Sequence, residues 1–350
     1  MRKTTIRTLA TGAALTLGMG LAACSGGSDA PGGADGDGLT KFSFQINQPP
    51  NGSNAPFAAA VEEGFYADEG LDVEIVPGVG SSQTAQMVAG GQAKIGYADS
   101  TSTAGLIAQD APLVVVATIY QSNPNEVIAL KESGITSVAD LKGKKVGTPV
   151  PSSQASMLPL FLEENDLTEN DVELVNLAPT SLAQSLLQGQ VDAILGSIDT
   201  YEVQLKEQGA TDMFTSMFAD NGVATVSTSI FAHEDYLKEN PEEVKAFVRA
   251  SIKGWAFAAD DPKAAVDDLD ALWGQKASKT SLEELQAAFD GDLLCAGGAK
   301  YVGRAEPEQW ETTQDLLSSV ELLPEGIDPT RYYTYDYLPE EGDLPTCPLG

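Results

Sequence analysis

Hydroxyl and amide side chains gather where predicted strands end and predicted helices begin. The stretch PGVGSSQTAQMVAGGQAKIGYADSTS, residues 77–102, runs from a Gly- and Ser-rich loop through a short helix into a strand that ends in more hydroxyls. Helix starts present unpaired backbone N–H groups with a partial positive charge, which suit a carboxylate, a sulfonate or a ring carbonyl. We therefore expect these loops to bind a small polar molecule.

Comparable loops follow the other predicted strands, and ligands of open α/β sheets bind beyond the carboxyl ends of the strands. For any one loop, helix capping is the favoured interpretation, because Ser, Asn and Asp are ordinary N-caps. Six such loops that converge between two domains favour a binding site. The candidate ligand-binding residues are Asn51, Ser53, Asn54, Ser81, Ser82, Asp99, Ser100, Thr101, Gln121, Ser152, Ser153, Gln154, Ser197 and Asp199.

Residues suited to catalysis are scarce in this chain. His233 is its one histidine, and we expect it to be exposed beside a polar, acidic loop. Without a second histidine or a cysteine pair at metal spacing, zinc and Cys–His catalysis are disfavoured. The segment GVGSSQ has no lysine to reach a terminal phosphate. We expect no catalytic residue, no metal and no cofactor.

The elements that position these loops alternate between strand and helix from Lys41 onward. This alternation predicts an α/β fold with mostly parallel sheets and right-handed crossovers. The pattern restarts near Gly134, so a second α/β lobe is expected as an insertion. We place lobe 1 at 41–130 and 226–350 and lobe 2 at 131–225, with Asn125–Leu130 and 224–232 as crossings. The helices near the C-terminus contain Trp255, Trp273 and Trp310, which we interpret as packing residues.

The first forty residues differ from the rest. Residues 1–23 have the basic start and the short apolar stretch of a secretory signal, and LAAC at residues 21–24 resembles a bacterial lipobox. We expect Cys24 to carry acyl chains such as palmitate and residues 24–40 to form a flexible tether, since this segment lacks large apolar residues. The alternative is an ordinary signal peptide that contains a cysteine.

Charge and cysteine content limit the possible partners. The formal net charge of −31 disfavours nucleic acid and anionic membrane surfaces as partners. Besides Cys24, the chain holds Cys295 and Cys347, and an exported protein can pair them in a disulfide. Two buried thiols are the alternative.

Several motifs resemble those of the extracytoplasmic solute-binding proteins of ABC importers, in the branch that binds sulfonates, nitrate and pyrimidine precursors of thiamine. The segments are FAAAVEEGFYADEGLDVEIVPG, MVAGGQAKIGYAD, SVADLKGKKVGTP, GQVDAILGS and QWETTQDLLSSVELLPEGIDPTRYYTYDYLP. The resemblance covers Lys41 to about Pro339. It implies a type II periplasmic-binding fold, two lobes joined by two crossings with the ligand in the cleft. Pyrimidine-binding members often carry a Trp after the first strand and a His in the next loop, whereas this chain reads NQPPNGSNAP there.

The resulting hypothesis is a monomeric, lipid-anchored receptor on the extracytoplasmic face of the cell membrane. It would capture a small polar organic solute (a sulfonate, an aromatic acid or a pyrimidine-like compound) and deliver it to ABC permease and ATPase subunits. One alternative is an enzyme of pyrimidine biosynthesis on the same fold, although the cysteine-rich motif and active-site His of the related yeast enzymes are missing. Another is a ligand-sensing domain for a signalling partner.

Overall fold

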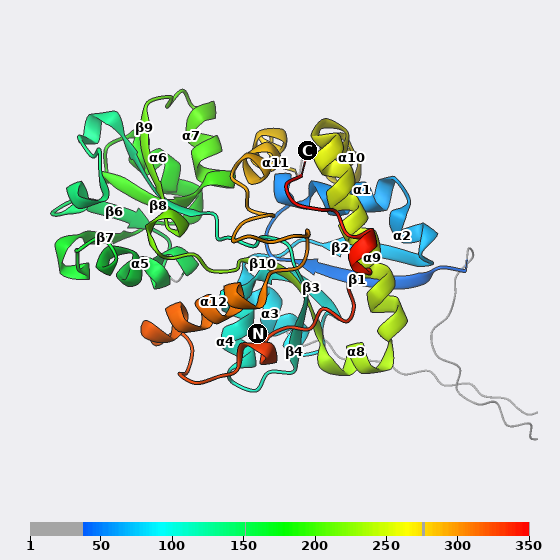
Figure 1. The fold of residues 1–350 in the computed structure, drawn as a ribbon. Coiled ribbons are helices and arrows are strands. Elements are labelled where there is room, and N and C mark those ends of the chain that lie inside the picture. Colours follow the sequence, from blue (N-terminus) through cyan, green and yellow to red (C-terminus); the bar gives the residue numbers. More distant parts are fainter. Residues whose placement is uncertain (1–37, 151, 275–276, 350) are drawn as a thin grey trace, which may run out of the picture. The chain divides into compact units, whose positions relative to one another are not determined.

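The computed structural model describes residues 38–150, 152–274 and 277–349 (Figure 1). The expected signal peptide, the lipidation site Cys24 and nearly all of the expected tether lie outside these ranges. None of the helices in the described ranges is both long and apolar enough to cross a membrane.

In the described ranges, ten strands form two five-stranded sheets. The first has the order β2-β1-β3-β10-β4, with β1 at Thr40–Ile46, β2 at Leu71–Val76, β3 at Ile95–Asp99, β4 at Leu113–Thr118 and β10 at Thr228–His233. The second has the order β7-β6-β8-β5-β9, with β5 at Asn125–Leu130, β6 at Lys145–Thr148, β7 at Glu173–Asn176, β8 at Ala193–Ser197 and β9 at Met213–Met217.

Each sheet has four strands that run one way and one strand that runs against them. The opposed strand is β10 in the first sheet, where it pairs antiparallel with β3 and β4. In the second sheet it is β5, which pairs antiparallel with β8 and β9. The mostly parallel α/β fold predicted from the sequence is therefore confirmed.

The prediction that Asn125–Leu130 is a crossing in lobe 1 needs correction, because this segment is β5 inside the second sheet. It is a short strand of six residues, so its sequence does not reveal which sheet it joins. Its partners β8 and β9 lie more than sixty residues further along the chain.

Helices cover both sheets. The helices that lie between or after the strands of the first sheet in the sequence are α1 (Ala55–Glu62), α2 (Phe65–Asp68), α3 (Ser81–Ala89), α4 (Ser100–Ile107), α8 (Glu234–Glu239), α9 (Pro241–Asp260), α10 (Pro262–Trp273), α11 (Ser281–Asp290) and α12 (Pro307–Ser319). Those of the second sheet are α5 (Ser153–Glu163), α6 (Leu182–Leu187) and α7 (Val203–Glu207). Trp255, Trp273 and Trp310 fall in α9, α10 and α12, as predicted.

The core of the first sheet is aromatic where β1, α1 and α9 meet. Phe42 stacks on Phe247 with ring centroids 4.8 Å apart, and Phe44 lies 5.0 Å from Phe57. A second buried cluster contains residues of both sheets, among them Val115 of β4 and Val127 of β5. The two sheets therefore share buried apolar contacts beside the segments that connect them.

Residues 119–124 and 222–227 are the segments that pass between the sheets, and hydrogen bonds hold them together. The Asn123 side chain donates through Nδ2 to the Val223 carbonyl at 2.7 Å and to the Thr225 hydroxyl at 3.2 Å. The Ser227 N–H donates to the Tyr120 carbonyl at 2.9 Å. These bonds keep the strand ends of both sheets turned toward a common junction.

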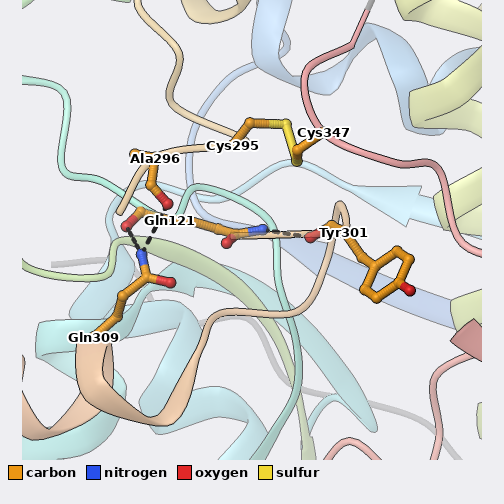
Figure 2. The surroundings of a disulfide bond; sticks show 6 residues. All are labelled: Gln121, Cys295, Ala296, Tyr301, Gln309 and Cys347. Carbon is orange, nitrogen blue, oxygen red and sulfur yellow. Dashed lines mark hydrogen bonds between the residues drawn. A yellow bond between two sulfur atoms is a disulfide. The ribbon is translucent and has the colours of Figure 1, made fainter. Parts of the chain in front are cut away.

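A disulfide supports the first of these segments (Figure 2). Cys295 and Cys347 are bonded, with Cα atoms 5.5 Å apart. In the loop that carries Cys295, the Leu293 carbonyl accepts the Gln121 N–H at 2.6 Å. The Gln121 side chain donates to the Tyr301 carbonyl at 2.8 Å, and Gln309 donates to the Gln121 carbonyl at 2.9 Å. The disulfide thus ties the C-terminal tail to a loop that holds the crossing.

Replacing both Cys295 and Cys347 by Ser should lower the free energy of unfolding. The disulfide spans 52 residues, and a loop of this size corresponds to about 4 kcal/mol of lost chain entropy in the unfolded state. Urea unfolding of the wild type and the double variant, both under oxidising conditions, measures the difference. Equal midpoints would contradict a stabilising role.

Candidate functional site

A groove of about 280 Å³ lies where helices of the two sheets face each other. Its walls contain Ser82 of α3 and Thr101 of α4 from the first sheet, and Ser152 and Ser153 at the start of α5 from the second. Four of the predicted binding residues are therefore brought together. Ser102 and Ser156, which were not among the candidates, contribute further hydroxyls to the walls.

Some of the predicted hydroxyls are engaged in holding the strand ends. Ser81 accepts hydrogen bonds from the Asp99 N–H at 3.2 Å and from the Asn47 side chain at 3.2 Å. Ser100 is buried and bonds to the Ser227 carbonyl and the Ser229 hydroxyl of β10. The hydrogen bonds of Ser81 and Ser100 therefore join the strand ends and loops that surround the groove.

The side chains of Asp99 and Ser152 cap the N-termini of helices. Asp99 accepts the Thr101 N–H at 3.0 Å at the start of α4 and the Ser227 hydroxyl at 3.0 Å. Burial raises the pKa of the Asp99 carboxyl, and these hydrogen bonds work against the rise. Ser152 accepts the Ala155 N–H at 3.1 Å at the start of α5. Both residues therefore cap helices at the border of the groove.

The loop after β1 contacts a carboxylate from α11. Asn51 accepts the N–H of Ser53 at 3.1 Å and its hydroxyl at 2.8 Å, which caps the short helical turn η1 at Gly52–Asn54. The Gly52 N–H donates to the Glu284 carboxylate at 2.9 Å. A Cβ atom at Gly52 would lie 2.3 Å from the Ser281 carbonyl, so this position requires glycine for the approach of α11.

Four buried groups near this loop that can donate a hydrogen bond have no partner within hydrogen-bond geometry among the described residues. They are Asn54 Nδ2, the Tyr97 and Tyr120 hydroxyl oxygens, and Trp255 Nε1. The residues lie close together, since Phe57 packs 4.8 Å from Tyr97 and 6.0 Å from Trp255, and Trp255 packs 6.1 Å from Tyr120, measured between ring centroids. An unpaired buried polar atom costs about 1–3 kcal/mol. Such a group is typical of a site that binds a polar ligand.

Sequence reasoning identified Asn54 but missed both tyrosines and read Trp255 as packing alone. Both tyrosines lie in predicted strands, where an aromatic residue is normally assigned to the hydrophobic core. Their positions in the sequence were a usable signal, because Tyr97 lies two residues before Asp99 and Tyr120 directly precedes the polar residues Gln121, Ser122 and Asn123. Aromatic residues with a polar tip at such strand ends can face a ligand.

The second sheet contributes acidic residues to the junction. Ser197 is the last residue of β8, and Asp199 follows in a single π-helical turn, η6, at Ile198–Glu202. Burial raises the pKa of Asp199 to about 6, and the Glu284 carboxylate adds to the rise while the Ser197 hydroxyl opposes it. In turn, Asp199 contributes to a raised pKa at Tyr97 and Tyr120, whose main cause is burial. Asp199 therefore lies close to both tyrosine hydroxyls, and that of Tyr120 also acts on the Asp199 carboxyl.

The remaining candidates are placed differently. Gln121 bonds to the disulfide-linked loop, with its amide directed at Tyr301, as Figure 2 shows. Gln154 accepts the Ser153 hydroxyl at 3.3 Å. His233 ends β10 opposite Leu113, the first residue of β4, and its Nδ1 accepts the Asp235 N–H at 3.2 Å. It is therefore at the far end of the sheet from the groove.

Comparisons with known proteins place the chain in a family. A family model described as NMT1/THI5 like matches residues 51–265, and the chain belongs to this family. The formylaminopyrimidine-binding protein of Halalkalibacterium halodurans is 27% identical over 305 residues, covering 84% of this chain and 89% of the relative. The riboflavin-binding protein RibY of Chloroflexus aurantiacus is 26% identical over 317 residues, covering 86% and 87%.

Other relatives are named as enzymes. The 4-amino-5-hydroxymethyl-2-methylpyrimidine phosphate synthase of Aspergillus parasiticus is 24% identical over 325 residues, covering 89% of this chain and 91% of the relative. Among solved structures, the aliphatic sulphonate-binding protein SsuA of Escherichia coli has a TM-score of 0.65 at 18% identity, covering 83% of this chain and 91% of that one. The periplasmic-binding fold and the predicted family are therefore confirmed.

Replacing Asp199 by Asn should stabilise the ligand-free protein above pH 6. A carboxyl whose folded pKa of about 6 exceeds its usual value of 3.8 destabilises the fold when ionised. That cost is absent below about pH 4, grows as the pH rises to about 6 and is constant above it. The gain for the variant should be about 1–3 kcal/mol at pH 7.5.

Melting temperatures at pH 4 and pH 7.5 measure this difference. Asp270→Asn serves as the control, because Asp270 is an exposed residue of α10. A lower melting temperature for Asp199→Asn at pH 7.5 would show that the carboxylate stabilises the fold instead.

Proposed function

We propose that this protein is a solute-binding protein of an ABC importer. It captures a small polar organic solute, such as a sulfonate, an aromatic acid or a pyrimidine-like compound, between its two lobes and delivers it to the permease. The observation that carries the proposal is the convergence of polar side chains from both sheets on one junction. Ser82 and Thr101 line the groove together with Ser152 and Ser153, and the hydroxyls of Tyr97 and Tyr120 lie close to Asp199.

The mechanism follows from two lobes connected by two crossings. We propose a first lobe of about residues 41–130 and 226–350 and a second lobe of about residues 131–225. We assign β5 to the second lobe, because it pairs with β8 and β9 of the second sheet. A ligand that contacts both lobes stabilises their closed arrangement over the open one. The permease and its ATPase partner then recognise the closed protein, and no covalent bond changes.

Several observations support this location and role. Two relatives that span most of the chain are named for the solutes they bind. The Cys295–Cys347 disulfide suits an oxidising, extracytoplasmic compartment. The LAAC sequence at residues 21–24 suits acylation of Cys24. We infer a monomer held at the extracytoplasmic face of the membrane by this lipid, with no nucleic-acid partner and no cofactor.

The relatives named as pyrimidine phosphate synthases favour a second candidate, an enzyme on the same fold. Two features of this chain count against it. The one histidine, His233, lies at the far end of its sheet from the groove. Cys295 and Cys347 are engaged in the disulfide, beside the crossing. We therefore favour binding without chemistry.

A ligand screen followed by single substitutions tests the proposal. A solute present at about 100 times its Kd stabilises the folded state by about 2.7 kcal/mol, so thermal shifts identify binders. Ser82→Ala and Ser153→Ala should then weaken binding by roughly tenfold, because each removes a hydrogen bond from the groove. Calorimetry measures affinity and thermal melting measures stability. Lower melting temperatures with unchanged affinities would mean that these serines only support their helices.

Cys24→Ala should abolish membrane attachment, because it removes the thiol that would be acylated. Cells that express the wild type or the variant are grown with radioactive palmitate, and the protein is recovered by precipitation. We expect label in the wild type alone. Equal label in both would overturn the lipid anchor and leave the binding function intact.

A further inference from the structure

The loop at residues 291–301 contacts three parts of the protein that matter for movement of the lobes. It follows α11 directly, and α11 packs against η6 of the second sheet. It carries Cys295, whose disulfide to Cys347 holds the C-terminal tail, residues 340–349. It also bonds to the first crossing, residues 119–124. A change at the disulfide can therefore reach the segment that joins the two lobes.

Hydrogen bonds from this loop and from the start of α12 converge on Gln121 (Figure 2). The Leu293 carbonyl accepts the Gln121 N–H at 2.6 Å. The Gln121 side chain donates to the Tyr301 carbonyl at 2.8 Å. Gln309 donates through Nε2 to the carbonyls of Gln121 at 2.9 Å and of Ala296 at 3.2 Å. Because Gln121 is 2% exposed, its position in the crossing depends on these partners rather than on water.

The crossing passes this restraint on to the candidate site. Tyr120 directly precedes Gln121, and its hydroxyl lies close to Asp199 of the second lobe. The Tyr120 carbonyl accepts the Ser227 N–H of the second crossing at 2.9 Å. Release of Gln121 would therefore free a side chain of the site and loosen the pairing of the two crossings.

The tail depends strongly on the disulfide for its attachment to the loop. Two backbone hydrogen bonds of 3.0 Å join residues 345–347 to residues 300–302. An exposed ion pair between Arg304 and Glu341 adds little, because water screens it. Leu344 is the one buried residue in the described part of the tail. Breaking the disulfide should therefore release the tail and the loop, while the apolar cores of the two sheets stay folded.

A hollow of about 470 Å³ gives access to the disulfide. Cys295 lines this hollow, together with Phe289 of α11 and with Pro348 and Leu349, which follow Cys347. Both cysteines are partly exposed. A small dithiol can enter this space and reach the sulfur atom of Cys295.

We propose, on the basis of the proposed function, that the Cys295–Cys347 disulfide is a redox-sensitive control of the hinge, and that its reduction by a dithiol lowers the affinity for the solute. A thiolate of the dithiol attacks Sγ of Cys295 to form a mixed disulfide, and Cys347 leaves as a thiolate that takes up a proton. The second thiol of the reductant then displaces Cys295, so the protein disulfide is reduced and the dithiol is oxidised to its own disulfide.

Lower affinity follows from the loss of order at the crossing. In the oxidised protein, the loop holds Gln121 and hence Tyr120 in place before the solute arrives. In the reduced protein, the crossing must be ordered when the solute binds, and this ordering reduces the free energy of binding.

Hydrogen exchange followed by mass spectrometry tests the coupling without any solute. The mature protein is labelled before and after treatment with dithiothreitol, and alkylation counts the thiols that are released. Amides within residues 119–124 should exchange at least tenfold faster in the reduced protein, while those of β8 stay unchanged. The variant with Cys295→Ser and Cys347→Ser should match the reduced protein and should not respond to dithiothreitol. Faster exchange confined to the loop and the tail would overturn the proposal, as would a folded protein that dithiothreitol does not reduce.

Calorimetry tests the effect on binding, with the compound that gives the largest shift in the thermal screen. At a temperature at which both forms are folded, reduction should weaken binding at least fivefold, and reoxidation should restore it. Phe247→Leu is the control, because it disturbs the stacking with Phe42 and lowers stability with the disulfide intact. This variant should keep the affinity of the wild type.

The outcomes separate this inference from the proposed function. Equal affinities of the oxidised and reduced forms would overturn the redox control and leave a solute-binding protein. An equal loss of affinity in Phe247→Leu would also overturn it, because lower stability alone would then explain the effect. If the screen finds no binder, the proposed function fails, and the control of affinity fails with it.

Discussion

The junction between the two sheets depends on the hydrogen bonds that join its two crossing segments. Asn123 bonds to Val223 and Thr225, and the Ser227 N–H bonds to the Tyr120 carbonyl. Because these bonds hold the crossings side by side, the strand ends of both sheets face one another. Tyr120 belongs to a crossing, so the segment that joins the lobes also carries a side chain of the candidate site. In the proposed mechanism, movement of the lobes and occupation of the site are coupled through the same few residues.

The candidate site carries an energetic cost that the rest of the fold must offset. Unpaired atoms on Asn54, Tyr97, Tyr120 and Trp255 are buried together, close to a carboxyl whose pKa burial raises to about 6. The aromatic cluster around Phe247 and the disulfide at the first crossing are stabilising features outside this group. Such a distribution is typical of functional sites, where side chains are arranged for a ligand at the expense of stability.

Much of the fold could be predicted from sequence, because local patterns determine it. Period-two strands, capped helices and glycine at turns gave the alternation of elements, and the motif resemblance gave the family. The placement of β5 could not be predicted. Its six residues form a strand in either sheet, and their sequence does not show that they pair with the distant strands β8 and β9. The site was predicted in part. Ser82 and Ser153 line the groove, but Ser100 bonds to β10, a neighbour that only tertiary structure supplies. The unpaired state of the Tyr97 and Tyr120 hydroxyls likewise depends on what surrounds them in three dimensions.

The central claim is that a solute bound at the junction draws the two lobes together. Spin labels on cysteines introduced at Asp270 of α10 and Glu207 of α7, both exposed, report the distance between the lobes. Pulsed electron resonance is recorded with and without the solute that gives the largest thermal shift, with the native disulfide intact. The account predicts a change to a single shorter distance that saturates at the Kd measured by calorimetry. Saturating binding with an unchanged distance distribution would contradict it.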